Sequence, residues 1–194
     1  MRIHRNDRAA SLGLDVDVDG VVVAARSMPS PNCDDRPDGA SIDLLVIHNI
    51  SLPPGEFGGR GVEALFTNSL NPADHPYYQT IQDLKVSAHF FIRRDGELIQ
   101  FVPCLKRAWH AGRSNWRGRE RCNDFSIGIE LEGTDDRPFT NQQYDTLGHL
   151  TRVLIATYPI QDVVGHSDVS RGRKTDPGNC FDWARYRSFY SYIS

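Results

Sequence analysis

The chain has 194 residues, of which 22 are basic and 25 acidic, giving a net charge of −3. This length suits one domain with a sizeable core, and the charge balance gives no general reason to expect nucleic acid or a membrane surface as a partner. The first twenty residues are charged throughout, and no stretch approaches the roughly 20 apolar residues of a membrane span, so we expect no signal peptide, no membrane helix and a cytoplasmic location.

The first elements follow a polar leading segment. Residues 1–26 are rich in charge, and we expect them to form a partly ordered arm in front of a single domain, 27–194. Within the arm, the apolar run 22–26 suggests a short strand or packed segment. The run 42–49 is apolar and short, which predicts a buried strand. Residues 60–70 carry apolar side chains at helical spacing and predict a helix.

Two strand signals follow in the middle of the chain. Residues 87–102 read as two strands joined at Asp95-Gly96, a strong hairpin signal. Residues 125–133 alternate in the manner of a strand, so successive side chains point to opposite faces. One face carries Ile127, Ile129 and Leu131, and the other carries Gly128, Glu130 and Glu132.

The last third of the chain is mainly helical in pattern. Residues 140–159 show apolar side chains at helical spacing and open with a capping box formed by Thr140 and Gln143. Residues 181–193 predict a final helix with an aromatic face. Because strands and helices are interleaved, we predict an α/β domain with a central mixed sheet flanked by helices.

The four cysteines are far apart in the sequence and form no CxxC pair. In a reducing compartment this spacing predicts free thiols and implies neither disulfides nor a cysteine zinc site. They are Cys33, Cys104, Cys122 and Cys180.

Candidate metal ligands come from two distant segments. His48 ends an apolar strand, where it is either a structural histidine with a buried partner or a metal ligand. The glycine-broken segment 165–178 carries His166, Lys174 and Asp176 in what reads as a loop. Two imidazoles and one carboxylate make three protein ligands for Zn²⁺ and leave a fourth position for water, which is typical of catalytic sites and suits amide hydrolysis.

Two further side chains fit the same chemistry. Glu130 could take a proton from water if its strand face lines the cleft; alternatively, Glu130 and Glu132 are solvent-facing acids. Lys174 could stabilise the oxyanion formed when water attacks an amide carbonyl, or it is an ordinary exposed lysine.

Five segments in register resemble a known enzyme family. They are "LLVIHNISLPPGEFGG", "SAHFFIRRDGELIQFVP", "RAWHAG", "RERCNDFSIGIELEGTD" and "GHSDVSRGRKTDPG" followed by "FDWAR". Together they closely resemble the zinc-dependent type 2 amidases, a group that includes the peptidoglycan recognition proteins, and in particular the cytoplasmic amidases of Gram-negative bacteria that act on anhydromuropeptides. The resemblance covers roughly residues 27–190 and implies a zinc amidase domain over 27–194.

The resemblance also implies roles for individual residues. His48, His166 and Asp176 match the family's ligands for one zinc ion per chain, Glu130 its catalytic glutamate, and Lys174 the lysine that assists at the tetrahedral intermediate. Residues matching the substrate cleft are Asn49, Lys85, Trp109, His110 and Arg121. Arginine is more usual in the family at position 85, and a lysine cannot make the same two-pronged contact with a carboxylate.

The implied reaction is hydrolysis of the amide between the lactyl group of anhydro-N-acetylmuramic acid and L-alanine of the stem peptide, by a monomer, in cytoplasmic peptidoglycan recycling. Loss of such an enzyme is expected to affect β-lactamase induction where the host has that system. Two alternatives remain open: an endolysin-type amidase that cuts intact peptidoglycan, and a non-catalytic muropeptide-binding module. Segment 51–80 is long and glycine- and proline-rich at its start, and we hypothesise that it is mobile and covers the cleft.

Overall fold

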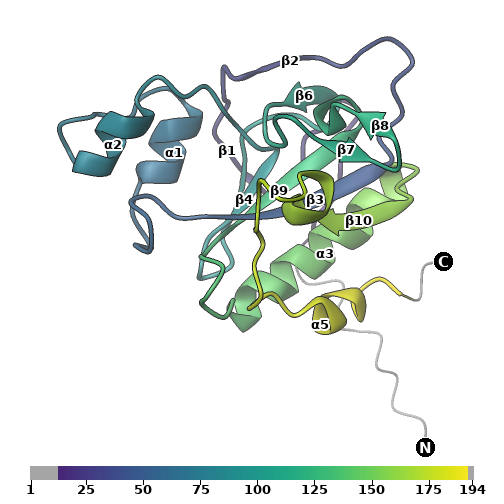
Figure 1. Cartoon of the computed structure of the whole chain (residues 1–194). Coiled ribbons are helices and arrows are strands. Elements are labelled where there is room, and N and C mark those ends of the chain that lie inside the picture. Colours follow the sequence, from purple (N-terminus) through teal and green to yellow (C-terminus); the bar gives the residue numbers. More distant parts are fainter. Residues whose placement is uncertain (1–12, 192–194) are drawn as a thin grey trace, which may run out of the picture.

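A six-stranded mixed sheet forms the centre of the domain in a computed structural model that describes residues 13–191 (Figure 1). Its strand order is β1-β5-β4-β9-β3-β10. The strands are β1 (Arg26–Ser27), β3 (Leu44–Ile50), β4 (Phe90–Ile92), β5 (Leu98–Gln100), β9 (Ser126–Glu132) and β10 (Asp162–Gly165). Strands β4, β9, β3 and β10 run parallel, whereas β5 returns antiparallel to β4 as the predicted hairpin.

Two short strand pairs and the helices complete the fold. The pairs are β2 (Cys33–Asp35) with β6 (Lys106–Ala108), and β7 (Asn115–Trp116) with β8 (Arg119–Glu120). The helices are α1 (Gly61–Phe66), α2 (Pro76–Ile81), α3 (Asn141–Thr157), α4 (His166–Val169) and α5 (Trp183–Arg187), with a 3-10 turn, η1 (Cys122–Asp124). The predicted single α/β domain with a central mixed sheet is confirmed. Within residues 13–191, none of the helices has the length and apolar character that crossing a membrane requires.

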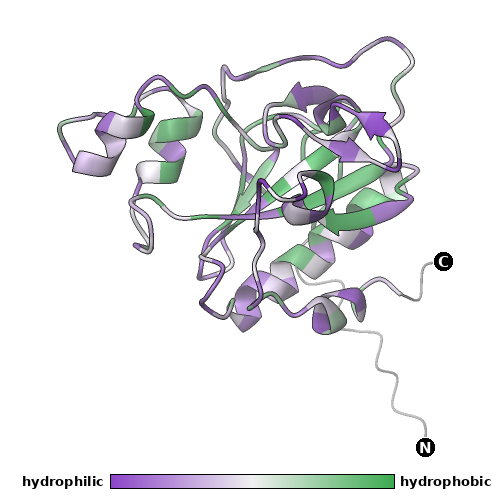
Figure 2. Ribbon diagram, viewed as in Figure 1, coloured by the Kyte–Doolittle hydropathy of each residue, from purple (hydrophilic) through white to green (hydrophobic). Residues whose placement is uncertain are grey.

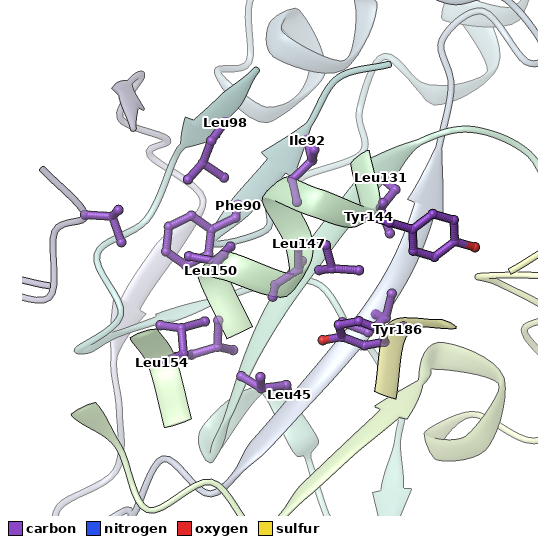
Figure 3. Close-up of a cluster of buried hydrophobic side chains, with 14 of the residues drawn as sticks. Leu45, Phe90, Ile92, Leu98, Leu131, Tyr144, Leu147, Leu150, Leu154 and Tyr186 are labelled. Carbon is purple, nitrogen blue, oxygen red and sulfur yellow. The ribbon is translucent and has the colours of Figure 1, made fainter. Parts of the chain in front are cut away.

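Helix α3 covers one face of the sheet. Alternate residues of β3 and β9 point toward it, and the apolar stripe of α3 meets them in a fully buried cluster (Figure 3). This cluster includes Leu45, Ile47, Phe90, Ile127, Ile129 and Leu131 from the sheet, with Leu147, Leu150, Leu154 and Tyr186 from the helices. Hydropathy colouring shows mostly apolar residues along the central strands and a mixture of polar and apolar residues along the helices (Figure 2).

The opposite face of the sheet is buried as well. Phe91 and Ile99 pack there against α1 and α2, in a second cluster that includes Leu65 and Phe66. All seven residues of β9 are therefore buried, because the strand is central and covered on both sides. The alternative that Glu130 and Glu132 are solvent-facing acids is wrong, since their exposed fractions are 8% and 3%.

Helix ends follow local signals. The capping box at Thr140 is present: its hydroxyl accepts from Gln143 N at 3.1 Å, and Gln143 Oε1 accepts from Thr140 N at 3.1 Å. The helix predicted over 60–70 is shorter and ends at Phe66, because the chain turns at Asn68, whose φ is +57°.

Several short elements were not predicted from the sequence. The final helix covers only Trp183–Arg187 of the predicted 181–193, and residues 192–194 lie outside the described part. The segment 165–178, which reads as a loop, opens with the single-turn helix α4. Strand β10 and helix α2 were also missed, because four to six residues carry too little periodicity.

The leading arm is anchored over its described part. Residues 1–12 lie outside that part, but Val22 is fully buried and its N–H donates to Gln100 Oε1 at 2.8 Å. Of the run 22–26, expected to be a short strand or packed segment, only Arg26 belongs to a strand, β1. Arg26 forms ion pairs with Glu63 of α1 at 2.7 Å and with Glu97, which lies between β4 and β5, at 2.8 Å. Residues 13–26 thus contribute to the core and to the contacts of α1.

All four cysteines are free, as the spacing predicts. Two of them, Cys104 and Cys122, are buried, and burial raises the pKa of the Cys104 thiol to about 12. This thiol therefore stays protonated at neutral pH and is a packing group.

Replacing Leu147 by alanine should lower the free energy of unfolding by about 2–5 kcal/mol, because the side chain is fully buried between α3 and the sheet. Urea unfolding followed by circular dichroism measures this loss. The control is Leu105→Ala, at a leucine that is 47% exposed, with an expected change within about 0.5 kcal/mol. Equal losses in both variants would contradict the assignment of the core.

Candidate metal centre and active site

The carboxyl ends of three parallel strands bring the candidate residues together. In the register of β3 and β9, His48 lies directly opposite Glu130. Strand β10 pairs with β3 on the other side and ends at Gly165 opposite Ile47, so His166 emerges next to His48. Segments more than a hundred residues apart therefore meet at one edge of the sheet.

Two histidines and one aspartate converge at this edge. Asp176 Oδ2 lies 3.1 Å from His48 Nδ1 and 3.0 Å from His166 Nδ1. One potential ligand atom from each of the three lies within 4.8 Å of the others. Both histidines are buried and the aspartate is partly buried. The three residues form a group that could hold a metal ion.

Contacts within the protein orient the imidazole rings of both histidines. His166 Nε2 donates to the carbonyl of Ala111 at 3.2 Å, and His48 Nε2 lies 2.9 Å from Nδ1 of His110. Both histidines therefore turn Nδ1 toward the aspartate. This is the arrangement in which outer hydrogen bonds fix the orientation of a ligand ring.

The loop that carries Asp176 is tied to β3. Asn49 Nδ2 donates to the carbonyl of Pro177 at 3.0 Å and to Asp135 Oδ1 at 2.7 Å. Gly178 then turns the chain at φ +84°, where a Cβ would lie 2.2 Å from the Cα of Asp135. Only glycine fits this position, and the close approach keeps the loop against the end of β9.

Glu130 is a buried carboxylate without a full set of partners. Its Oε2 is buried and has no hydrogen-bond partner, and its Oε1 lies 3.9 Å from His48 Nδ1. Burial, together with the negative charge of Asp176, raises the pKa of Glu130 well above its usual range, while Lys174 acts in the opposite direction. A buried polar atom without a partner inside a cleft is suited to act on a ligand.

The surroundings also shift the pKa of His48 and that of Asp176. Burial lowers the pKa of His48 to about 4, although the hydrogen bond to Asp176 acts in the opposite direction. Burial alone would raise the pKa of Asp176, but hydrogen bonds from His166 and His48 outweigh it and the pKa falls below the usual value of 3.8. Neutral imidazoles and an ionised carboxylate are the forms that bind metal ions.

A cleft of about 730 Å³ opens over these groups. Asn49, Trp109, Glu130 and Lys174 line it together with two of the ligand candidates, His166 and Asp176. Its other wall is apolar and comes from α2 and the residues that follow it, with Tyr77, Ile81 and Leu84 facing the opening. Segment 51–80 is thus partly helical and forms one side of the cleft.

Two of the residues expected to contact substrate, Lys85 and Arg121, do not line the cleft, whereas His110 does. Lys85 is exposed between two residues that line the cleft but is not itself part of the lining. Arg121 is exposed, lies 3.2 Å from Asp124 Oδ2, and lines a separate cavity of about 780 Å³ that shares Arg173 with the cleft. His110 borders the cleft, but both its ring nitrogens have partners within the protein.

Some groups of the site were not foreseen from the sequence. Asp135 follows the end of β9, and polar residues at strand ends are a signal that could have found it. The carbonyl of Ala111 left no trace in the sequence, because any residue supplies a backbone carbonyl. The apolar wall depends on α2, whose six residues gave no usable pattern.

Comparison with known proteins assigns the family. Residues 38–179 match the family model for N-acetylmuramoyl-L-alanine amidase, which spans most of the chain. The chain belongs to the N-acetylmuramoyl-L-alanine amidase family, and the enzyme class expected from the sequence is confirmed.

Within this family the chain is similar to AmpD proteins. The 1,6-anhydro-N-acetylmuramyl-L-alanine amidase AmpD of Escherichia coli K12 is 58% identical over 174 residues, which cover 89% of this chain and 95% of that protein. A crystal structure of a selenomethionine AmpD derivative matches with a TM-score of 0.87 and 56% identity, covering 90% of this chain and 98% of that one. The amidase AmiD of E. coli, solved with an anhydro-N-acetylmuramic acid tripeptide, matches with a TM-score of 0.58 and 29% identity, covering 90% and 65%.

The metal-free protein should lose stability as the pH falls. Burial lowers the pKa of His48, His89 and His110 below the value of about 6.5 that histidines have in an unfolded chain. The unfolded state therefore binds more protons below about pH 6.5, and each such histidine removes about 1.4 kcal/mol per pH unit until its folded-state pKa is reached. Urea unfolding of chelator-treated protein between about pH 8 and pH 5 measures this slope. A free energy of unfolding that stays constant over this range would contradict it.

Proposed function

We propose that the chain is a zinc-dependent amidase that hydrolyses the amide between the lactyl group of 1,6-anhydro-N-acetylmuramic acid and L-alanine of the stem peptide. The observation that carries the proposal is the group of His48, His166 and Asp176 at the floor of the cleft, beside the unpartnered Glu130. The identity to AmpD proteins and the substrate complex of AmiD support the choice of substrate.

The residues present suit one zinc ion. Two imidazoles that present Nδ1 and one carboxylate match the three protein ligands of catalytic zinc sites, in which a fourth position stays open. Zinc bound there would polarise the amide carbonyl and lower the pKa of a water molecule toward about 7. The carboxylate oxygen Oδ2 of Asp176 lies 3.1 Å from Nδ1 of His48 and 3.0 Å from Nδ1 of His166.

Glu130 and Lys174 would handle the proton and the developing charge. Glu130 takes a proton from the attacking water as the new C–O bond forms at the lactyl carbonyl carbon. The same proton then passes to the alanine nitrogen as the C–N bond breaks, so the carboxylate is regenerated. Lys174, exposed at the cleft wall, stabilises the negative charge on the carbonyl oxygen. The raised pKa of Glu130 makes its carboxylate a stronger base toward the attacking water.

Substrate binding would use the two walls of the cleft. We assign Asn49 and Trp109 to the sugar and the lactyl group, because both line the cleft near the catalytic groups. The exposed Lys85 and Arg121 could reach only the outer part of a stem peptide. All catalytic groups come from one chain, which supports a monomer as the working form.

The wider role follows from the substrate. We propose that the enzyme works in the cytoplasm on anhydromuropeptides that re-enter peptidoglycan synthesis. In a host with an inducible β-lactamase, its loss would let these compounds accumulate and change the induction.

Product analysis by mass spectrometry tests the reaction. Wild type should release free tripeptide from anhydromuramyl tripeptide, whereas Asp176→Ala and chelator-treated protein should not, because each lacks a complete metal site. Cleavage that survives both losses would refute the metal mechanism. Faster cleavage of intact sacculi than of the anhydromuropeptide would favour an endolysin-type amidase, and binding without turnover would favour a binding module.

Glu130→Gln should lower kcat by about 100-fold or more, since an amide of the same shape cannot accept the proton. Bound zinc should stay at the wild-type amount, which atomic absorption measures. The matched control is Glu132→Gln on the same strand face, whose carboxylate instead accepts from the N–H groups of Gly58 and Arg94. That variant should lose stability but keep kcat within about threefold, because it holds a loop and touches no substrate. An unchanged kcat in Glu130→Gln would remove this residue from the mechanism.

A further inference from the structure

His110 is a buried histidine with both ring nitrogens engaged. It is 9% exposed, its Nδ1 lies 2.9 Å from His48 Nε2, and its Nε2 lies 3.1 Å from Ser126 Oγ. The Ser126 hydroxyl is itself 2.6 Å from the carbonyl of Cys122. These contacts form one continuous chain from a backbone carbonyl to a candidate metal ligand.

The hydroxyl of Ser126 determines which groups donate and which accept in this series of hydrogen bonds. A carbonyl oxygen only accepts hydrogen bonds, so the Ser126 proton points to Cys122 and the hydroxyl lone pairs face His110. His110 must therefore carry its proton on Nε2, which leaves Nδ1 as an acceptor. His48 then donates from Nε2, and its own Nδ1 is free to face Asp176 and His166.

The next residue holds the second imidazole in the same way. The carbonyl of Ala111 accepts from His166 Nε2 at 3.2 Å, which leaves the Nδ1 of that ring toward Asp176. Asn123 fixes this dipeptide, since its Oδ1 accepts from the N–H groups of His110 and Ala111 at 3.2 and 2.8 Å.

We infer that His110 and Ala111, held by Ser126 and Asn123, form one positioning unit that presents Nδ1 of both His48 and His166 to the metal. The inference deepens the proposed function and rests on the metal site proposed there. It makes His110 a positioning residue that acts through His48, in place of the substrate contact expected from the sequence.

The packing around the ring supports this role. A Cβ at Gly128 would lie 2.4 Å from Cγ of His110, so β9 leaves room for the imidazole only because position 128 is glycine. Gly128 lies two residues before Glu130 on the same strand face, so the imidazole of His110 packs against β9 close to Glu130.

NMR of the imidazole nitrogens in wild-type protein tests which groups donate and which accept in this series of hydrogen bonds. Long-range proton–nitrogen spectra should show His110 as the neutral Nε2–H tautomer, both without metal and with zinc. An Nδ1–H tautomer of His110 in either state would overturn the inference. The metal-free spectrum keeps this test separate from the proposed function, which fails if wild type binds no zinc.

Zinc affinity measures how much the hydrogen-bonded positioning unit contributes to metal binding. His110→Leu should bind zinc about 10–100-fold more weakly than wild type in competition with a chromophoric chelator, because His48 loses its outer acceptor. His110→Asn, whose amide oxygen can replace Nδ1 as the acceptor, should restore affinity to within about threefold of wild type. Ser126→Ala should weaken zinc binding, because Nε2 of His110 loses its acceptor.

The control removes a buried hydroxyl far from the site. Thr151 bonds to Tyr186 at 2.6 Å, and Thr151→Val should lower stability while leaving zinc affinity unchanged. If His110→Leu and His110→Asn bind zinc equally, or if Thr151→Val weakens zinc binding as much as Ser126→Ala does, then the effect is general destabilisation and the inference fails.

Discussion

The parallel pairing of β3 with β9 on one side and β10 on the other is the constraint on which the site depends. It places His48 opposite Glu130 and starts α4 with His166 beside them. Because side chains alternate along a strand, a slip of one residue would turn both His48 and Glu130 toward α3. The apolar cluster against α3 fixes the register, so the packing of one face determines the chemistry of the other.

The same edge of the sheet concentrates polar groups that a protein interior tolerates only when they have partners. The imidazoles of His48, His110 and His166 meet this requirement through one another, a serine and a backbone carbonyl. Asp176 supplies the charge that two Nδ1 atoms face, and Glu130 alone keeps an oxygen without a partner. Nearly all of these groups are buried, so burial does not separate the structural groups from the reactive ones. Their hydrogen bonding does.

Much of the frame could be predicted from the sequence, because long elements repeat their pattern. The apolar run before His48, the alternation around Glu130 and the capping box at Thr140 each gave a correct element. Short elements such as β10 and α2 could not be found, since their order comes from neighbours distant in sequence. The three ligand types could be grouped by chemistry and by family resemblance, but the place of His110 behind His48 depends on a tertiary contact between segments 62 residues apart.

The loop that carries Asp176 has a consequence for protein synthesis. His48 and Asp176 are separated by 128 positions. Because a nascent chain emerges from its N-terminus, the three ligands cannot coexist until Asp176 has been synthesised. Strand β10 must also dock beside β3 before His166 reaches its place. The growing polypeptide therefore cannot bind a metal ion at this site before Asp176 has emerged, and metal uptake reports that β3, β10 and the loop of Asp176 have come together.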